Sequence, residues 1–109
     1  MQPSIEPARP FASVEAAWFS TARALQSGRG AHDHVDGVLR CLDRLYRNRR
    51  IELLHARILR IWGGRGIAPN PAYPRERSDW RIWREALDRL EGPLRAQGIV
   101  VHCQPAPAE

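Results

Sequence analysis

Four stretches of this sequence carry apolar residues at the spacing of a helix face, and glycine, proline or asparagine separates each stretch from the next. In residues 14–27 the apolar positions lie three or four apart, which places them on one side of an α-helix. Ser13 is a favourable N-cap, Glu15 suits the positive end of the helix dipole, and Gly28 can end the helix. The side chains expected to be buried on this helix are Val14, Ala17, Trp18, Thr21, Ala22 and Leu25.

The same periodicity predicts three further helices, over about residues 35–47, 52–62 and 76–97. Asn48 tolerates the left-handed conformation that ends many helices, and Gly98 is placed to cap the last one. The side chains expected on the three buried faces are Val35, Val38, Leu39, Leu42, Leu45 and Tyr46, then Leu54, Ile58, Ile61 and Trp62, then Trp80, Trp83, Leu87, Leu90 and Leu94.

The outer face of the last helix is rich in opposite charges four residues apart, and Pro93 is expected to kink its final turn. The ion pairs expected there are Arg81–Glu85, Arg84–Asp88, Glu85–Arg89 and Glu91–Arg95.

The breaks between these stretches set the fold class. Segment 63–74, GGRGIAPNPAYP, is expected to end the third helix and to form a stiff connector, either a strap over the core or a recognition element. Residues 99–103 are β-prone and can add one short strand or cover the core. The sequence therefore predicts an all-α fold, a compact bundle of three to four helices with a helix-turn-helix-like core. We expect one helical domain over residues 13–103, between a flexible N-terminal arm, 1–12, and a flexible C-terminal tail, 104–109.

The positive charge of the chain is concentrated in its middle. All 17 basic residues are arginine, and the net charge is +5. Between Arg40 and Arg65, eight arginines face two acidic residues, a local net charge of +6. Arginine suits phosphate because its planar guanidinium group donates two hydrogen bonds at once, although a GC-rich genome also supplies arginine codons. The side chains expected to form a basic surface are Arg40, Arg44, Arg47, Asn48, Arg49, Arg50, Arg57 and Arg60.

Clustered like charges repel one another unless an anion offsets them, and nucleic acid is the anion that we expect. The hypothesis is a small DNA-binding regulatory or accessory domain, in which the arginines hold phosphates and Asn48 contacts a base or the backbone. RNA could replace DNA. The alternatives are a protein-interaction module that docks an acidic partner or pairs with a second copy of itself, and a solvated basic face without an anionic partner. Oligomeric state and sequence preference stay open.

Two segments carry a resemblance to a known family. ELLHARILRIWGGRG (52–66) is similar to the first helix of winged-helix regulators, and WREALDRLEGPLRAQGIV (83–100) is similar to the end of their recognition helix and the start of the wing. The proline-rich segment 67–74 stands where those proteins have an intervening helix. The resemblance implies DNA binding and transcription regulation. The chain as a whole resembles small bacterial proteins.

Other functional classes find little support in the residues. No spacing typical of a catalytic triad, a phosphate-binding glycine loop or a zinc site is present, so we expect no catalysis, metal or cofactor. His32, His34, His102 and Cys103 are expected to be surface residues, and Cys41 is expected in the core. The four tryptophans are expected in the core rather than stacked on bases. With no long apolar run and no signal-like N-terminus, we expect no membrane contact and a cytoplasmic location with free thiols, a disulfide being the minor alternative.

Overall fold

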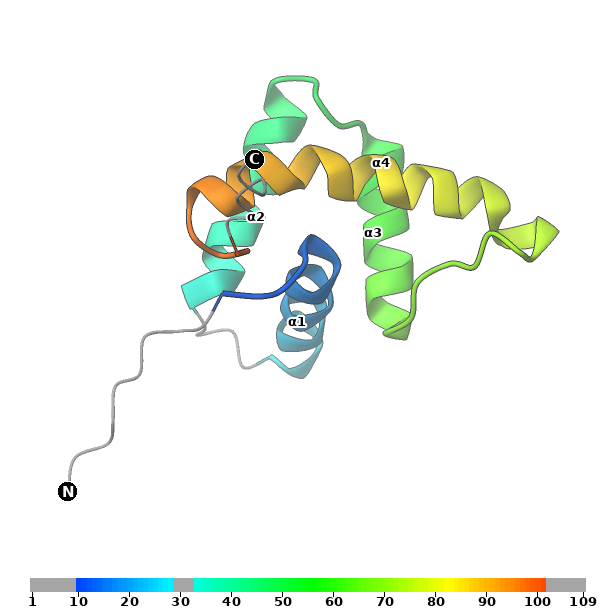
Figure 1. The fold of residues 1–109 in the computed structure, drawn as a ribbon, viewed down its shortest axis with the longest axis horizontal. Coiled ribbons are helices and arrows are strands. Elements are labelled where there is room, and N and C mark those ends of the chain that lie inside the picture. The colour runs from blue at the N-terminus through cyan, green and yellow to red at the C-terminus, as the bar shows by residue number, and fades with distance from the viewer. Residues whose placement is uncertain (1–9, 29–32, 102–109) are drawn as a thin grey trace, which may run out of the picture.

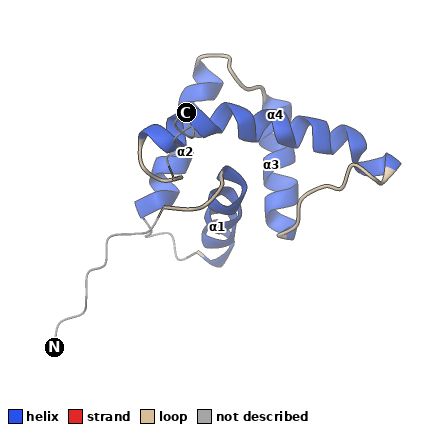
Figure 2. Ribbon diagram, in the orientation of Figure 1, coloured by secondary structure: helices blue, strands red, loops and turns tan. Residues whose placement is uncertain are grey.

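The computed structural model describes residues 10–28 and 33–101, and it confirms the all-α prediction. Its four helices are α1 (Val14–Ser27), α2 (Asp33–Arg47), α3 (Leu53–Arg65) and α4 (Pro74–Ala96). Helix α4 crosses both α2 and α3, and α1 packs against the other three (Figure 1). No named strand occurs within the described ranges, as Figure 2 shows by colour.

The ends of α1 follow the prediction. The Ser13 side chain accepts a hydrogen bond from the Ala16 N–H at 3.0 Å. Gly28 ends the helix in the left-handed region, with φ of 73°. At the other end of the chain, α4 begins at Pro74, earlier than expected, because proline fits the first position of a helix, where no backbone donor is needed.

The predicted end of the third helix at Trp62 is wrong. Helix α3 continues through Gly63 and Gly64 to Arg65, and Gly66 ends it with φ of 74°. The reason is close packing: the Trp18 indole Nε1 donates to the Leu59 carbonyl at 2.8 Å. A Cβ atom on Gly63 would lie 2.6 Å from that nitrogen. The glycine therefore admits the indole to the helix surface and does not terminate the helix.

The core contains residues from all four helices. Leu59, Trp83, Leu90 and Leu94 are fully buried, and Trp18 is 5% exposed. The indole N–H groups of the buried tryptophans are hydrogen-bonded; Trp83 Nε1, for example, donates to Glu15 Oε2 at 2.9 Å. The prediction that the tryptophans pack inside is confirmed for Trp18, Trp62 and Trp83, while Trp80 is half-buried.

Four residues predicted to face inward are instead largely exposed, so those predictions are wrong. Their exposed fractions are 49% for Leu25, 50% for Tyr46, 46% for Leu54 and 40% for Ile61. On α3 the buried stripe consists of His55, Ile58, Leu59 and Trp62, because a hydrogen-bonded histidine takes the place expected for a leucine. On α1 and α2 the apolar stripe is wider than the surface that the neighbouring helices cover.

The two described ends of the chain lie together. Phe11, which the sequence placed in the N-terminal arm, forms an isolated parallel bridge with Val100. The Phe11 N–H donates to the Ile99 carbonyl at 2.8 Å, and the Val101 N–H donates to the Phe11 carbonyl at 2.9 Å. Gly98 makes this return possible with φ of 77°. The β-prone segment thus covers one edge of the core. The remainder of the predicted arm and tail lies outside the described residues.

None of the helices in the described part of the chain is long and apolar enough to cross a bilayer.

Candidate nucleic-acid interface

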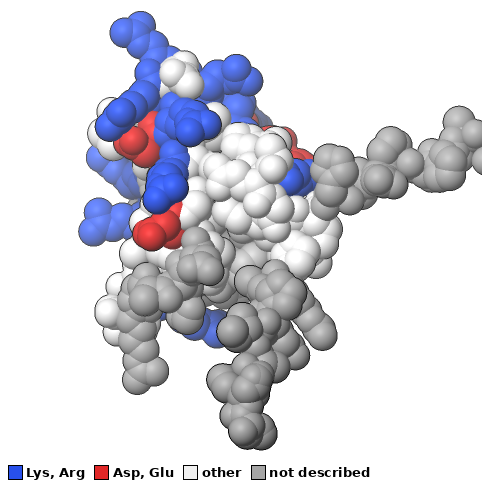
Figure 3. All heavy atoms as spheres, turned by 90° about the vertical axis from the view of Figure 1, so that its left-hand side faces the viewer, with Lys and Arg blue, Asp and Glu red and all other residues white. Residues whose placement is uncertain are grey.

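Every residue predicted for the basic surface is exposed. Arg40, Arg44 and Arg47 lie on α2, and Arg57 and Arg60 lie on α3. Asn48, Arg49 and Arg50 occupy the turn between the two helices. Figure 3, which views the molecule from the α2 side, shows basic side chains gathered along one edge of that face, with few acidic groups among them.

The turn that carries Arg49 and Arg50 is held in one conformation. The Asn48 N–H donates to the Arg44 carbonyl at 2.9 Å, and the Arg50 N–H donates to the Leu45 carbonyl at 2.8 Å. Ile51, only 2% exposed, anchors the far side of the turn in the core. The left-handed residue is Arg49, with φ of 61°, rather than Asn48. Because a residue with a Cβ atom adopts this conformation at a cost of about 1 kcal/mol, the turn holds Arg49 against its own preference.

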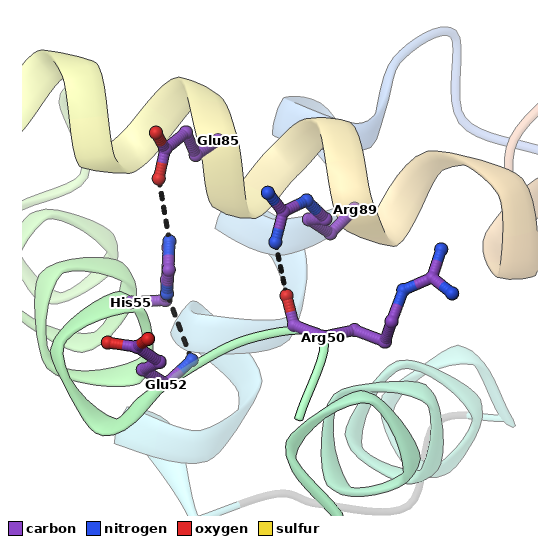
Figure 4. Close-up of polar contacts among 5 residues, drawn as sticks. All are labelled: Arg50, Glu52, His55, Glu85 and Arg89. Carbon is purple, nitrogen blue, oxygen red and sulfur yellow. Dashed lines mark hydrogen bonds and ion pairs between the residues drawn. The ribbon is translucent and has the colours of Figure 1, made fainter. Parts of the chain in front are cut away.

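A polar clasp joins this turn and the start of α3 to α4 (Figure 4). The Glu52 N–H donates to His55 Nδ1 at 2.9 Å, so this ring nitrogen carries no proton. The proton therefore lies on His55 Nε2, which donates to Glu85 Oε1 at 2.9 Å. This hydrogen bond, with the nearby charge of Arg89, lowers the pKa of Glu85 below its ordinary value. One turn further along α4, Arg89 Nη1 donates to the Arg50 carbonyl.

The clasp leaves a basic pocket beside it. The pocket encloses about 220 Å³. Its lining comes from α2, the turn and α4, and it contains no acidic residue. The lining residues are Cys41, Arg44, Leu45, Asn48, Arg50, Arg89 and Pro93. Arg89 was missing from the predicted surface, since the sequence pairs it with Glu85. The sequence carries no signal that could have found it, because Arg50 and Arg89 are 39 positions apart and only the fold brings them together.

Few acidic side chains neutralise these arginines. Arg47 pairs with Asp43 at 3.1 Å, but both groups are mostly exposed, so the pair contributes little. No other ion pair within residues 10–28 and 33–101 involves the arginines predicted for the surface. On α4 the expected pairs Arg84–Asp88 and Glu91–Arg95 form. The two pairs expected at Glu85 are absent from the ion pairs of the described chain, because its carboxylate bonds to His55 instead.

The predicted surface divides into two parts. Arg44 and Arg50 share the pocket with Arg89. Arg60 lines a different hollow, between α1, α2 and α3, together with Leu25 and Leu42. The structure therefore brings Arg44, Asn48 and Arg50 together with Arg89 of α4 in one pocket. The other predicted residues, Arg40, Arg47, Arg49, Arg57 and Arg60, do not line that pocket.

Cys41 is a core residue, as expected, at 3% exposed. Burial raises the pKa of its thiol, with nearby Arg44 acting in the opposite direction. Gln97 Nε2 also donates to the sulfur at 3.2 Å. In the described part of the chain, no group of three or more His, Cys, Asp or Glu side chains is arranged to hold a metal ion. His32, His102 and Cys103 lie outside the described residues, while His34 lies 3.0 Å from the Ser20 hydroxyl.

No family model matches this sequence, and comparisons with curated proteins and with solved structures return no match. The similarity of segments 52–66 and 83–100 to winged-helix regulators therefore stays a prediction.

Proposed function

We propose that the protein binds nucleic acid, with duplex DNA as the first candidate, through phosphate contacts made on the α2 side of the molecule. The contacting side chains are Arg40, Arg44, Arg47, Asn48, Arg49, Arg50 and Arg89, and Arg57 and Arg60 extend the surface when the duplex is long enough to reach α3. One observation carries the proposal: guanidinium groups from α2, the turn and α4 line one pocket that has no acidic residue in its lining.

The chemistry of phosphate favours such a pocket. A phosphate carries negative charge on oxygens that a guanidinium fork can bind in pairs. Arg89 is oriented by its bond to the Arg50 carbonyl, so part of the ordering cost is already met in the free protein. Each phosphate neutralised releases condensed counterions, which drives association and makes it depend on salt. One phosphate contact from each of the six arginines on the α2 side predicts a slope of about −5 in a plot of log affinity against log salt for B-DNA.

The test is binding of a fluorescent random duplex, followed by anisotropy at two salt concentrations. We expect binding that weakens steeply with salt, by the slope given above. Replacement of Arg44, Arg50 and Arg89 together by alanine should weaken binding by about tenfold or more and flatten the slope by about 2 to 3. The matched control replaces Arg75, Arg81 and Arg84, three exposed arginines of α4, and removes the same charge.

Equal losses in the two triple variants would refute the pocket, because only general charge would then matter. Absence of binding to the duplex at low salt would refute nucleic-acid binding as a whole. A duplex RNA of the same length completes the comparison. Tighter binding to RNA would assign the surface to an A-form backbone, whose phosphate spacing differs from that of DNA. The finer part of the proposal is a role in transcription regulation in a bacterial cytoplasm. Its regulatory part requires that one DNA sequence bind well above the random duplex.

A further inference from the structure

A groove runs along the outer side of α3, separate from the basic pocket. Its upper part, beside the first residues of α3, measures about 360 Å³ and lies between α2 and α3. Its lower part, about 570 Å³, lies between α1, α2 and α3. The two parts share Leu42 and Ala56 in their linings, so they adjoin each other along α3. On α3 it extends from Leu53 to Gly64, about 16 Å at the helical rise of 1.5 Å per residue.

The lining of this groove is mainly apolar and open to solvent. Leu53 is 60% exposed, Tyr46 is 50% exposed and Leu25 is 49% exposed. Leu39 and Leu42, at its floor, are only partly buried. Leu25 and Tyr46 continue the apolar stripes of their own helices, yet about half of each side chain stays exposed. Apolar surface left in water is unfavourable, and a contiguous exposed apolar patch usually marks an interaction site.

The charge around the groove is positive. Arg60 belongs to the lining, and Arg57 follows Leu53 by one helical turn on the same exposed side of α3. Asp43 is the single acidic residue among the lining residues, and Arg47 pairs with it at 3.1 Å. At the lower end, Gln26 Nε2 donates to the Gly64 carbonyl at 3.0 Å and closes the gap between α1 and α3. A molecule bound in the groove would therefore contact apolar side chains at its base and arginine side chains along one side.

We propose that this groove binds an acidic amphipathic helix of a partner protein. Large apolar side chains of that helix, three and four residues apart, fill the hollow over Leu42 and Ala56, and its flanking aspartates or glutamates face Arg60 and Arg57. Helix-in-groove recognition uses this spacing of anchors, and complementary charge sets the orientation and speeds association. A helical segment of about 11 residues, close to 16 Å long, matches the groove. The groove shares no lining residue with the proposed phosphate pocket between α2 and α4, although Arg57 and Arg60 also belong to the outer part of the proposed nucleic-acid surface.

The probe is a phage-displayed library of helix-forming peptides of about 16 residues, or some four helical turns. Selection on the full chain is expected to enrich peptides with an apolar face and acidic flanks. One enriched peptide is then synthesised, labelled and titrated by anisotropy against variants. Leu53→Gln removes an exposed groove residue, and Leu54→Gln is the matched control, because Leu54 is the next leucine on α3 but does not line the groove. Arg60→Glu tests the charge, with Arg75→Glu as its control on α4.

We expect Leu53→Gln and Arg60→Glu each to weaken peptide binding by about tenfold or more, and each control by less than about threefold. Enrichment of neutral or basic peptides, the absence of enrichment, or equal effects of Leu53→Gln and Leu54→Gln would overturn the proposal. If sedimentation shows that the wild type is a dimer and that Leu53→Gln is a monomer, the groove would be assigned to a second copy of the chain instead. Loss of duplex binding in Leu53→Gln would assign it to nucleic acid. If the duplex-binding test refutes the phosphate pocket while the groove variants change peptide binding as expected, the groove proposal still holds.

Discussion

Replacing Gly63 with alanine should destabilise the protein, although the same change inside an exposed helix normally stabilises it by about 1 kcal/mol. The added methyl group would lie 2.6 Å from Trp18 Nε1 and 3.0 Å from the Ala22 Cβ. The indole is 5% exposed, so it has no free space into which to move.

The magnitude follows from these contacts. Displacing the indole breaks its bond to the Leu59 carbonyl, and a buried donor without a partner costs about 1 to 3 kcal/mol. Overpacking of the contact adds about 1 to 3 kcal/mol. After the gain in helix propensity is subtracted, Gly63→Ala should lose about 1 to 5 kcal/mol of unfolding free energy, or about 4 °C or more in melting temperature.

Urea unfolding followed by circular dichroism measures this loss, and Gly64→Ala is the matched control on the same helix. A Cβ atom at Gly64 would lie 3.2 Å from the Gln26 amide nitrogen, the far end of an exposed and flexible side chain. That variant should be unchanged or more stable by up to about 1 kcal/mol. A Gly63→Ala protein as stable as the Gly64→Ala protein would refute the assignment of Gly63 to the Trp18 contact. In a double-mutant cycle, Trp18→Phe should offset part of the Gly63→Ala loss.

Three further predictions concern the polar contacts. Because the pKa of Glu85 is lowered in the folded state, its carboxylate adds stability above its ordinary value of 4.5, and this stability disappears as pH falls through the lowered value. The melting-temperature difference between the wild type and Glu85→Gln should therefore shrink on acidification, and a constant difference would contradict the His55 contact. The Cys41 thiol is buried and its pKa is raised, so it should react with Ellman's reagent at least about tenfold more slowly in the folded protein than in denaturant. The rates are measured in a Cys103→Ser background, and equal rates would place the Cys41 thiol at the surface. Asp79 accepts the Trp62 Nε1 hydrogen bond at 3.0 Å, so Asp79→Ala should lose about 1 to 2 kcal/mol in urea unfolding, while Asp79→Asn, which keeps an acceptor oxygen, should lose less.

Helix position is the part of this fold that local sequence patterns determine well. Helix α1 runs from Val14 to Ser27, as its apolar spacing, Ser13 and Gly28 indicate. The errors occur where a residue serves a distant neighbour. Gly63 is a helix terminator by its local chemistry, yet it admits Trp18 from another helix. His55 is a polar residue whose burial depends on Glu85, 30 positions away.

The candidate site shows the same limit. The arginines of α2 and the turn could be identified from charge density alone, since like charges concentrated in one segment of the chain are visible in the sequence. Arg89 could not, because α4 carries nearly balanced charge and only the crossing of α4 over the turn places Arg89 beside Arg50. The groove could not be predicted either. Periodicity marks Leu25 and Tyr46 as apolar-face residues, but it does not say whether another helix reaches them.

The bridge between Phe11 and Val100 has a mechanical consequence. The two segments run parallel, so tension applied between residues 10 and 101 pulls them along each other in opposite directions. The two backbone hydrogen bonds, from Phe11 to Ile99 and from Val101 to Phe11, then carry the load together in shear, rather than opening one after the other as in a zipper. Force entering the chain at these ends therefore meets this small clamp before it reaches the helices.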